Sequence, residues 1–432
     1  MSIKYVLFFS FISITGFSQP AKSLKDIRVN QDRIEKRIFE LAKFGKGPDG
    51  KSYRVAFSKA DQEGRAYYIG LLKNARLEVS IDYAGNIIGR RKGNDPTKKP
   101  IAFGSHIDMV PDGGNYDGCV GSMGAIEVME VLNENKIITE HPLELIIFSN
   151  EEGGVIGSMA IAGQLKKEGL DVVTNSGLTN REGIKAIGGN PDNIHLVARK
   201  PGDIKAYLEL HIEQGGILDA ENNQIGVVEG IVGIDEWEIT VEGFANHAGT
   251  TPMNKRQDAL LAASKLVIAV NEVINSYEGR QVGTVGKVAA SPGAYNVIPG
   301  KVMLGLEIRD LSSEKIVKLF RDIEKRAAEI ALNTGTKISF RNLNVPAKPA
   351  LMTSAIQDKI TESAKMLGYS YKRMQSGAGH DAQEMAQIAP AGMIFVPSVG
   401  GISHSPKEFT KAVDMANGAN VLLHTVLALD KQ

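Results

Sequence analysis

The stretch that most constrains the fold covers residues 101–123 and reads IAFGSHIDMVPDGGNYDGCVGSM. It opens with an apolar run typical of the end of a buried strand, and a helical pattern begins after Gly121. His106, Asp108 and Asp117 lie between the two. This arrangement suits a metal site in an α/β protein, because ligands bind where strands end and loops begin. From these residues alone, a polar surface loop remains the alternative.

Length and charge narrow the class of protein. At 432 residues the chain is too long for one ordinary core, so two domains are expected. Basic and acidic residues balance at 50 each and no basic block stands out, so neither nucleic acid nor an anionic membrane is an expected partner. The single cysteine, Cys119, cannot form an intramolecular disulfide, and a nucleophilic role for it is not favoured.

The N-terminus has a character of its own. Residues 1–4 carry one positive charge, residues 5–16 are continuously apolar, and small residues suited to cleavage follow at Gly16 and Ser18. This pattern predicts a signal peptide over residues 1–18, an exported (periplasmic or secreted) protein, and no membrane association after cleavage. An uncleaved anchor is the alternative.

Two textures follow along the rest of the chain. Buried strands with glycine-rich joints, such as residues 143–148 before Glu151 and Glu152, predict an α/β sheet covered by helices. Alternation over residues 206–213 places His211 beside carboxylates near a strand end. From about residue 230 the order of elements becomes β-α-β-β-α-β, typical of a ferredoxin-like sandwich. The predicted domains are an α/β domain (19–229 plus 344–432) and an insert (230–343).

Five of the eight histidines sit in glycine-rich or acidic junctions, which favours a functional site over a surface loop. They are His106, His211, His247, His380 and His404. In this context the chain resembles the M20 metallopeptidase family, and within it the amidase branch of N-carbamoyl-L-amino acid hydrolases, allantoate amidohydrolases and β-ureidopropionases. The matching blocks, in chain order, are GSHIDMVPDGGNYDG from Gly104, NEEGG from Asn150, LELHIEQGGIL from Leu208, GFANHAGTTPM from Gly243, NVIPG from Asn296, LEIRD from Leu306, SGAGHDA from Ser376 and GGISHSPKEFT from Gly400.

The resemblance implies an M20-like catalytic domain, with a mixed sheet flanked by helices, and an inserted ferredoxin-like lid and dimerisation domain. It also implies two divalent ions per subunit, drawn from zinc, manganese, cobalt and nickel. His106, Asp117 and His211 would hold one ion. Asp117, Glu152 and His404 would hold the other, so that Asp117 bridges the pair. Two such ions about 3.5–4 Å apart polarise a carbonyl and activate a shared water.

The resemblance assigns further roles around these ligands. Asp108 would orient the His106 imidazole, and Glu151 would act as general base, taking a proton from the water and returning it to the leaving nitrogen. A solvated acidic loop is the alternative for Glu151 and Glu152. One departure from the family pattern is Glu307, which stands where aspartate is common and is expected to shift the neighbouring arginine slightly.

Substrate contacts are implied on both domains. In the insert, Arg309 would clamp a carboxylate bidentately, while His247 and Asn296 would donate hydrogen bonds. Some of these residues would act across a homodimer interface formed by the insert. Gln214 and His380 would contact the urea or amide head, although for His380 a structural role in pinning the glycine loop is the alternative.

The expected activity is hydrolysis of a linear carbamoyl or ureido C–N bond on a small carboxylate, with N-carbamoyl-L-amino acids and allantoate as leading substrates. Two alternatives remain: an exported M20 dipeptidase or aminoacylase, and a non-catalytic binding protein on the same scaffold. The HIEQG and SGAGHDA blocks count against the first. The intact set of predicted ligands and base counts against the second.

Overall fold

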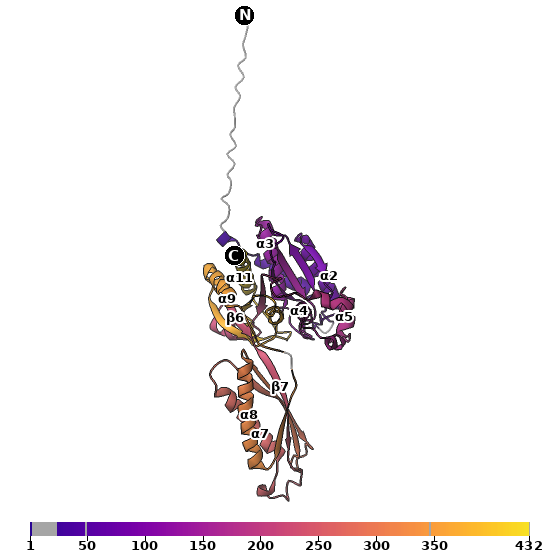
Figure 1. The fold of residues 1–432 in the computed structure, drawn as a ribbon, viewed down its shortest axis with the longest axis vertical. Coiled ribbons are helices and arrows are strands. Elements are labelled where there is room, and N and C mark those ends of the chain that lie inside the picture. Colours follow the sequence, from indigo (N-terminus) through magenta and orange to yellow (C-terminus); the bar gives the residue numbers. More distant parts are fainter. Residues whose placement is uncertain (2–23, 48–49, 345–346, 432) are drawn as a thin grey trace.

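The computed structural model describes residue 1 and residues 24–47, 50–344 and 347–431. The signal peptide predicted over residues 1–18 lies outside the described residues, apart from Met1. The described residues from Leu24 onward form two bodies (Figure 1). The larger is built on a nine-stranded sheet and the smaller on a four-stranded sheet, and strand β7 leads from the larger body into the smaller one.

The larger sheet is mixed, as the resemblance implied. Its order is β1-β2-β4-β3-β5-β13-β6-β11, and β12 pairs with β6 away from this path. At its centre β3 lies parallel to both β4 and β5, and β13 lies parallel to β5, whereas β2 and β6 run antiparallel to their neighbours β4 and β13. The strands are β1 Glu78–Ile81, β2 Ile87–Arg91, β3 Ile101–His106, β4 Leu143–Phe148, β5 Ala206–Ile212, β6 Ile225–Ile231, β11 Ala350–Leu351, β12 Tyr371–Ser376 and β13 Ala391–Val396.

Helices cover both faces of this sheet, so its central strands are buried on both sides. Phe103 and Leu145 pack into a core with α1, α2, α3, α9 and α11, while their neighbours Ala102 and Ile146 pack on the other face with α4 and α10. The helices are α1 Gln31–Leu41, α2 Lys59–Asn74, α3 Cys119–Glu134, α4 Ile156–Ile161, α5 Asn180–Ala186, α6 Ile217–Glu221, α9 Ser354–Leu367, α10 Asp381–Met385 and α11 Ala412–Asp430. Short 3-10 turns are η1 Leu24–Asp26, η2 Lys167–Asp171, η3 Pro191–Val197, η4 Met253–Lys255 and η5 Val399–Gly401.

Helix α11 is the one described helix that is long and apolar enough to cross a membrane. However, 83% of its apolar window is buried inside the protein. Its side chains pack with α3, α9 and the central strands, so it serves as a core helix here.

The smaller body has the element order that the sequence predicted for the insert. Its antiparallel sheet runs β10-β7-β9-β8, and α7 and α8 pack on one face, where Trp237 stacks on Phe320 with ring centroids 4.1 Å apart. It leaves the larger sheet after β6 and returns at β11, which pairs with β6. Its elements are β7 Gly233–Glu242, α7 Ala259–Asn275, β8 Val282–Ser291, β9 Lys301–Asp310, α8 Ser313–Thr334 and β10 Lys337–Asn342. The domain boundaries and the role as a lid stay predictions.

The central strands leave no room for a side chain at Gly104 of β3, where an added Cβ would lie 1.8 Å from the backbone oxygen of Ile146 on β4. We predict that Gly104→Ala lowers the free energy of unfolding by about 1–3 kcal/mol, because the strand pair must separate. Gly70→Ala is the control, since a Cβ at Gly70 in α2 has no heavy atom within 4 Å. It should raise stability by about 0.5–1 kcal/mol. Shifts of the same sign in denaturant unfolding would contradict this account.

Candidate metal centre

The parallel strands β3, β4 and β5 bring their carboxyl ends to one edge of the larger sheet. His106 is the last residue of β3, and His211 is the last but one of β5. The loop after β4 carries Glu151 and Glu152, and Asp117 lies just before α3. Strands that end together therefore gather these side chains at one edge of the sheet, where the opening stretch predicted a site for His106 and Asp117.

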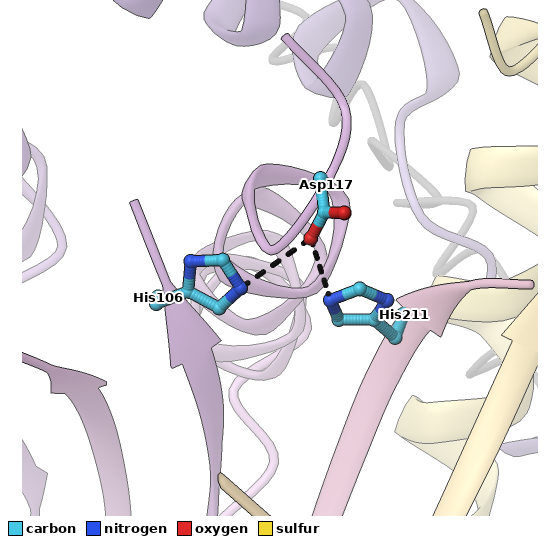
Figure 2. Close-up of side chains that lie close together, drawn as sticks. All are labelled: His106, Asp117 and His211. Atoms are coloured by element: carbon cyan, nitrogen blue, oxygen red, sulfur yellow. Dashed lines mark ion pairs between the residues drawn. The ribbon is translucent and has the colours of Figure 1, made fainter. Parts of the chain in front are cut away.

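One side of the site is a pair of histidines on a shared carboxylate oxygen (Figure 2). Asp117 Oδ1 lies 3.1 Å from His211 Nε2 and 3.5 Å from His106 Nε2. The other ring nitrogens face backbone oxygens: His211 Nδ1 lies 2.9 Å from Ile212 O, and His106 Nδ1 lies 3.1 Å from Asp108 O. Both rings are buried, so their orientation is set by the protein.

The second carboxylate oxygen of Asp117 faces another group. Oδ2 lies 3.4 Å from His404 Nε2, and His404 Nε2 lies 3.6 Å from Glu152 Oε2. The Gln214 amide stands between them, with Nε2 2.7 Å from Asp117 Oδ2 and 3.3 Å from His404 Nε2. Asp117 thus connects two sets of donors, one through each oxygen.

The nitrogen and carboxylate oxygen atoms of these side chains suit divalent cations as ligands. The ligand atoms of His106, Asp117 and His211 all lie within 4.8 Å of one another, and so do those of Asp117, Glu152 and His404. Among the residues described, His106 Nε2 and Glu152 Oε1 are buried without a hydrogen-bond partner. Orphaned buried atoms of this kind are costly unless something binds them. Mixed nitrogen and carboxylate donors suit zinc, manganese, cobalt or nickel.

The protonation of the cluster points the same way. Burial raises the pKa of Glu151 well above its usual range, and burial together with Asp117 raises the pKa of Glu152 to about 7. The hydrogen bond to Asp117 raises the pKa of His404 to about 9. Without a cation, the cluster therefore holds protons near neutral pH that metal binding would displace.

Asp108 contacts the cluster in a different way from the one expected. Its carboxylate lies 3.7 Å from His106 Nδ1, and the backbone oxygen makes the closer contact to that ring. The carboxylate oxygens instead accept the backbone N–H groups of Glu151 at 3.3 Å and Glu152 at 3.2 Å. Asp108 therefore orients the imidazole through its main chain and holds the acidic loop through its side chain.

A cavity of ≈ 460 Å³ opens above the cluster. The predicted site residues that line it are Asp117, Glu151, Glu152, Gln214, Arg309, His380 and His404. His247 and Asn296 do not line it: both are exposed on the smaller body, where an isolated bridge pairs His247 with Val297, the residue after Asn296. The structure of one chain thus gathers all of the proposed ligands but leaves two of the predicted substrate contacts apart.

Arg309 reaches this cavity from β9 of the smaller body. Its Nη1 donates to the backbone oxygen of Gly377 at 2.6 Å, which joins the two bodies. Its Nε and Nη2 donate to both carboxylate oxygens of Glu307, at 2.7 and 2.9 Å. The guanidinium already holds a carboxylate in the bidentate geometry expected for substrate, and Glu307 supplies it.

His380 lies both at the cavity and beside the glycine loop, and its role as a substrate contact stays a prediction. It lines the cavity, and its ring lies 4.4 Å from that of His211. Its Nε2 also lies 2.8 Å from Ser376 Oγ, which hydrogen-bonds the backbone of Ala378 in the glycine loop. Burial, reinforced by His211, holds the pKa of His380 well below its usual value, so it is a neutral ring.

Glu408 is a site residue that the sequence analysis missed. Its Oε1 accepts the backbone N–H groups of Tyr116 at 2.9 Å and Asp117 at 3.0 Å. Its Oε2 accepts the Ser403 hydroxyl at 3.0 Å and the His404 N–H at 3.3 Å. One buried carboxylate therefore fixes the loops of Asp117 and His404 together. Its place four residues after His404 was the available clue.

Glu209 lies on the same face of β5 as His211, as the alternation predicted, but the sequence analysis gave it no role. It accepts hydrogen bonds from Ser105 Oγ at 3.1 Å, from Tyr207 Oη at 3.2 Å and from the Ala382 N–H at 2.8 Å. It therefore ties the start of α10 to the floor of the site. A carboxylate in the middle of a buried strand was the sequence clue.

Comparison with known proteins identifies the family. Residues 102–428 match the model for peptidase family M20/M25/M40. The chain is 39% identical to an N-carbamoyl-L-amino acid amidohydrolase of Geobacillus stearothermophilus, over 93% of this chain and 99% of the relative. It is 33% identical to the allantoate amidohydrolase of Escherichia coli (strain K12), over 90% and 95%. An amidase of the hydantoinase/carbamoylase family from Burkholderia multivorans superposes with a TM-score of 0.88 at 36% identity, covering 94% of this chain and 99% of that one.

The fold and the relatives together define the class. The chain belongs to peptidase family M20/M25/M40. Within that family it falls in the hydantoinase/carbamoylase amidase branch, which confirms the resemblance.

Because Glu408 holds both loops of the centre, its removal should weaken metal binding. We predict that Glu408→Ala lowers the affinity for Zn²⁺ or Mn²⁺ about 10–100-fold, as loss of a group that orients ligands usually does. Calorimetric titration of metal-free protein measures this. Glu168→Ala, at an exposed position in η2, is the control. Equal affinities for the two variants would contradict the role of Glu408.

Proposed function

We propose that this protein is a metal-dependent amidohydrolase that cleaves a linear carbamoyl or ureido C–N bond of a small carboxylate. The observation that carries the proposal is the Asp117-centred cluster beside Glu151, in a cavity that Arg309 reaches. Relatives whose names specify N-carbamoyl-L-amino acids or allantoate support this substrate class. They do not favour the dipeptidase, aminoacylase or binding-protein alternatives.

The ligands of the proposed ion pair are those that lie around Asp117. His106, Asp117 and His211 would hold one divalent ion, and Asp117, Glu152 and His404 would hold the second. Bound there, the two ions supply Lewis acidity for the scissile carbonyl and for the attacking water. The Gln214 amide contacts Asp117 and His404, where the second ion would bind. It must therefore move away when the ion binds, or turn toward the substrate's carbamoyl group.

Glu151 is the proposed general base. It is buried at the cavity wall, its Oε2 lies 3.6 Å from His106 Nε2, and Asp108 holds its backbone. It takes a proton from the attacking water and delivers it to the leaving nitrogen. For an N-carbamoyl amino acid and one water, the products are the amino acid, ammonia and carbon dioxide. The raised pKa of Glu151 suits a group that must also act as an acid.

Arg309 binds the substrate carboxylate in this proposal. Glu307 occupies the fork of its guanidinium, so the substrate competes with an internal carboxylate of the same charge. His380, as a neutral ring next to His211, faces the carbamoyl head. Movement of the smaller body as a lid would bring Arg309 onto the substrate and exclude water.

A homodimer formed by the smaller body completes the proposal. Strand β8 is an edge of its sheet, and Val288 and the nearby Tyr295 are exposed apolar side chains. Exposed edges and apolar side chains are typical of surfaces that pair with another chain. A two-fold interface there would carry His247 and Asn296 of one subunit toward the cavity of the other.

We also propose that the protein is exported. The charged start, apolar stretch and small residues at the N-terminus support this. N-terminal sequencing of the native protein tests it: a start near residue 19 supports export, and a start at Met1 contradicts it.

Ammonia release by the metal-loaded protein tests the activity. The substrates are N-carbamoyl-L-amino acids, allantoate and β-ureidopropionate, with dipeptides scored by free amine. We predict that Glu151→Gln lowers kcat about 10²–10⁴-fold, because general acid–base catalysis contributes that much. Metal content, measured by elemental analysis, should be unchanged. Unchanged activity would show that Glu151 is not the base, and cleavage of dipeptides alone would contradict the substrate class.

Complementation tests the role of His247 across the interface. Glu151→Gln and His247→Ala should each be inactive as homodimers. A heterodimer isolated through two affinity tags should regain about half of the wild-type activity, because one of its two sites has both groups. Pairing Glu151→Gln with Arg309→Ala is the control, and it should give no rescue, since Arg309 lines the cavity of its own chain. No rescue in the first pair would contradict the arrangement.

A further inference from the structure

The cavity extends past the metal centre to helix α10. Gln383 and Glu384 line it there, about one helical turn beyond His380. Neither residue belongs to the proposed ligands, the base or the carboxylate clamp. They therefore line a part of the cavity to which the proposed chemistry assigns no role.

Glu384 is a buried carboxylate without a cation. It is 8% exposed, and its one recorded hydrogen bond comes from Gln387 Nε2 to Oε2 at 2.7 Å. Within the described part of the chain, no lysine, arginine or histidine forms an ion pair with it. A carboxylate in this position keeps acceptor capacity that a donor in the cavity can use.

Gln383 also presents an acceptor. Its Nε2 donates to the backbone oxygen of Lys348 at 2.6 Å and lies 3.4 Å from that of Val232. Because both partners are carbonyl oxygens, they fix which end of the amide is nitrogen. The Oε1 of Gln383 has no recorded donor among the described residues, so this side chain has an acceptor to offer and its donors are used.

The rest of the lining at this end is apolar or cannot donate from a side chain. Val155, Met159, Ala347 and Ala378 contribute to the wall, and Arg309 is the one lysine or arginine among the described lining residues. Arg309 is paired with Glu307 and Gly377, so it does not neutralise Glu384 in this structure. Two hydrogen-bond acceptors in an apolar wall form a polar subsite that favours groups with N–H donors.

We propose that Gln383 and Glu384 form an acceptor subsite that selects substrates whose side chain ends in N–H donors, either a neutral ureido group or an ammonium group. The proposal rests on the proposed function and extends it to side-chain specificity. The substrate carboxylate lies on Arg309 and its carbamoyl group on the metal centre. The distal N–H groups then donate to Glu384 and Gln383. A site built to bind donors rejects an analogue that lacks them, because its buried acceptors stay unpaired.

Three substrates that share one backbone test the proposal. N-carbamoyl-L-norleucine has an apolar side chain, N-carbamoyl-L-citrulline ends in a neutral ureido group, and Nα-carbamoyl-L-lysine ends in an ammonium group. For the metal-loaded wild type, we expect kcat/KM for at least one donor substrate to exceed that for norleucine by about tenfold or more. Glu384→Leu should bring that ratio near one. A wild-type preference for norleucine, or a ratio unchanged by the substitution, overturns the subsite.

Glu384→Gln separates the two kinds of donor and guards against a folding defect in Glu384→Leu. It keeps the shape and an acceptor but removes the charge. If the wild type prefers the lysine derivative, Glu384→Gln should lose that preference and retain activity on the citrulline derivative. The role of this side chain is contradicted if both variants, Glu384→Gln and Glu384→Leu, keep the wild-type ratios of kcat/KM.

Binding separates failure of the subsite from failure of the proposed function. Calorimetry with metal-loaded Glu151→Gln measures the affinity for the same three compounds without turnover. Tighter binding of a donor compound than of the norleucine compound supports the subsite even if the wild type releases no ammonia, a result that would overturn only the proposed hydrolysis. Equal affinities overturn the subsite whether or not ammonia is released.

Discussion

The site depends on the contacts that the Asp117 carboxylate makes with two groups of side chains. One oxygen faces His106 and His211, the other faces His404, and Glu152 lies beside that second histidine. These side chains come from strand ends and loops up to three hundred residues apart in sequence, so a carboxylate that touches both groups has to be positioned from several directions. Burial makes each of these polar groups costly unless every one has a partner.

The surrounding structure supplies that positioning through backbone contacts. Glu408 holds the loops of Asp117 and His404, and Asp108 holds the loop of Glu151 and Glu152. The parallel strands beneath are packed closely enough that Gly104 cannot accept a Cβ. A rigid floor with carboxylate-tethered loops is what a metal centre needs, since ligand geometry is set before the ion arrives.

Local patterns predicted where several of these groups lie, whereas their roles as metal ligands came from the resemblance to the family. His106 and His211 mark the ends of apolar strands, and the acidic pair after β4 follows a third. The β-α-β-β-α-β order also has its own periodicities. Local patterns cannot show long-range hydrogen bonds, so Glu408 was missed, and they cannot tell whether Asp108 uses its side chain or its backbone. His247 and Asn296 illustrate a third limit, because both are exposed on the smaller body and do not line the cavity where the resemblance placed them.

The central claim is that Asp117 bridges two divalent ions. Crystals of the protein loaded with zinc or manganese, measured at the metal's absorption edge, test it directly through anomalous scattering. The account predicts two peaks on either side of the Asp117 carboxylate, about 3.5–4 Å apart, one by His106 and His211 and one by Glu152 and His404. A single peak, or a pair that does not share Asp117, would contradict it.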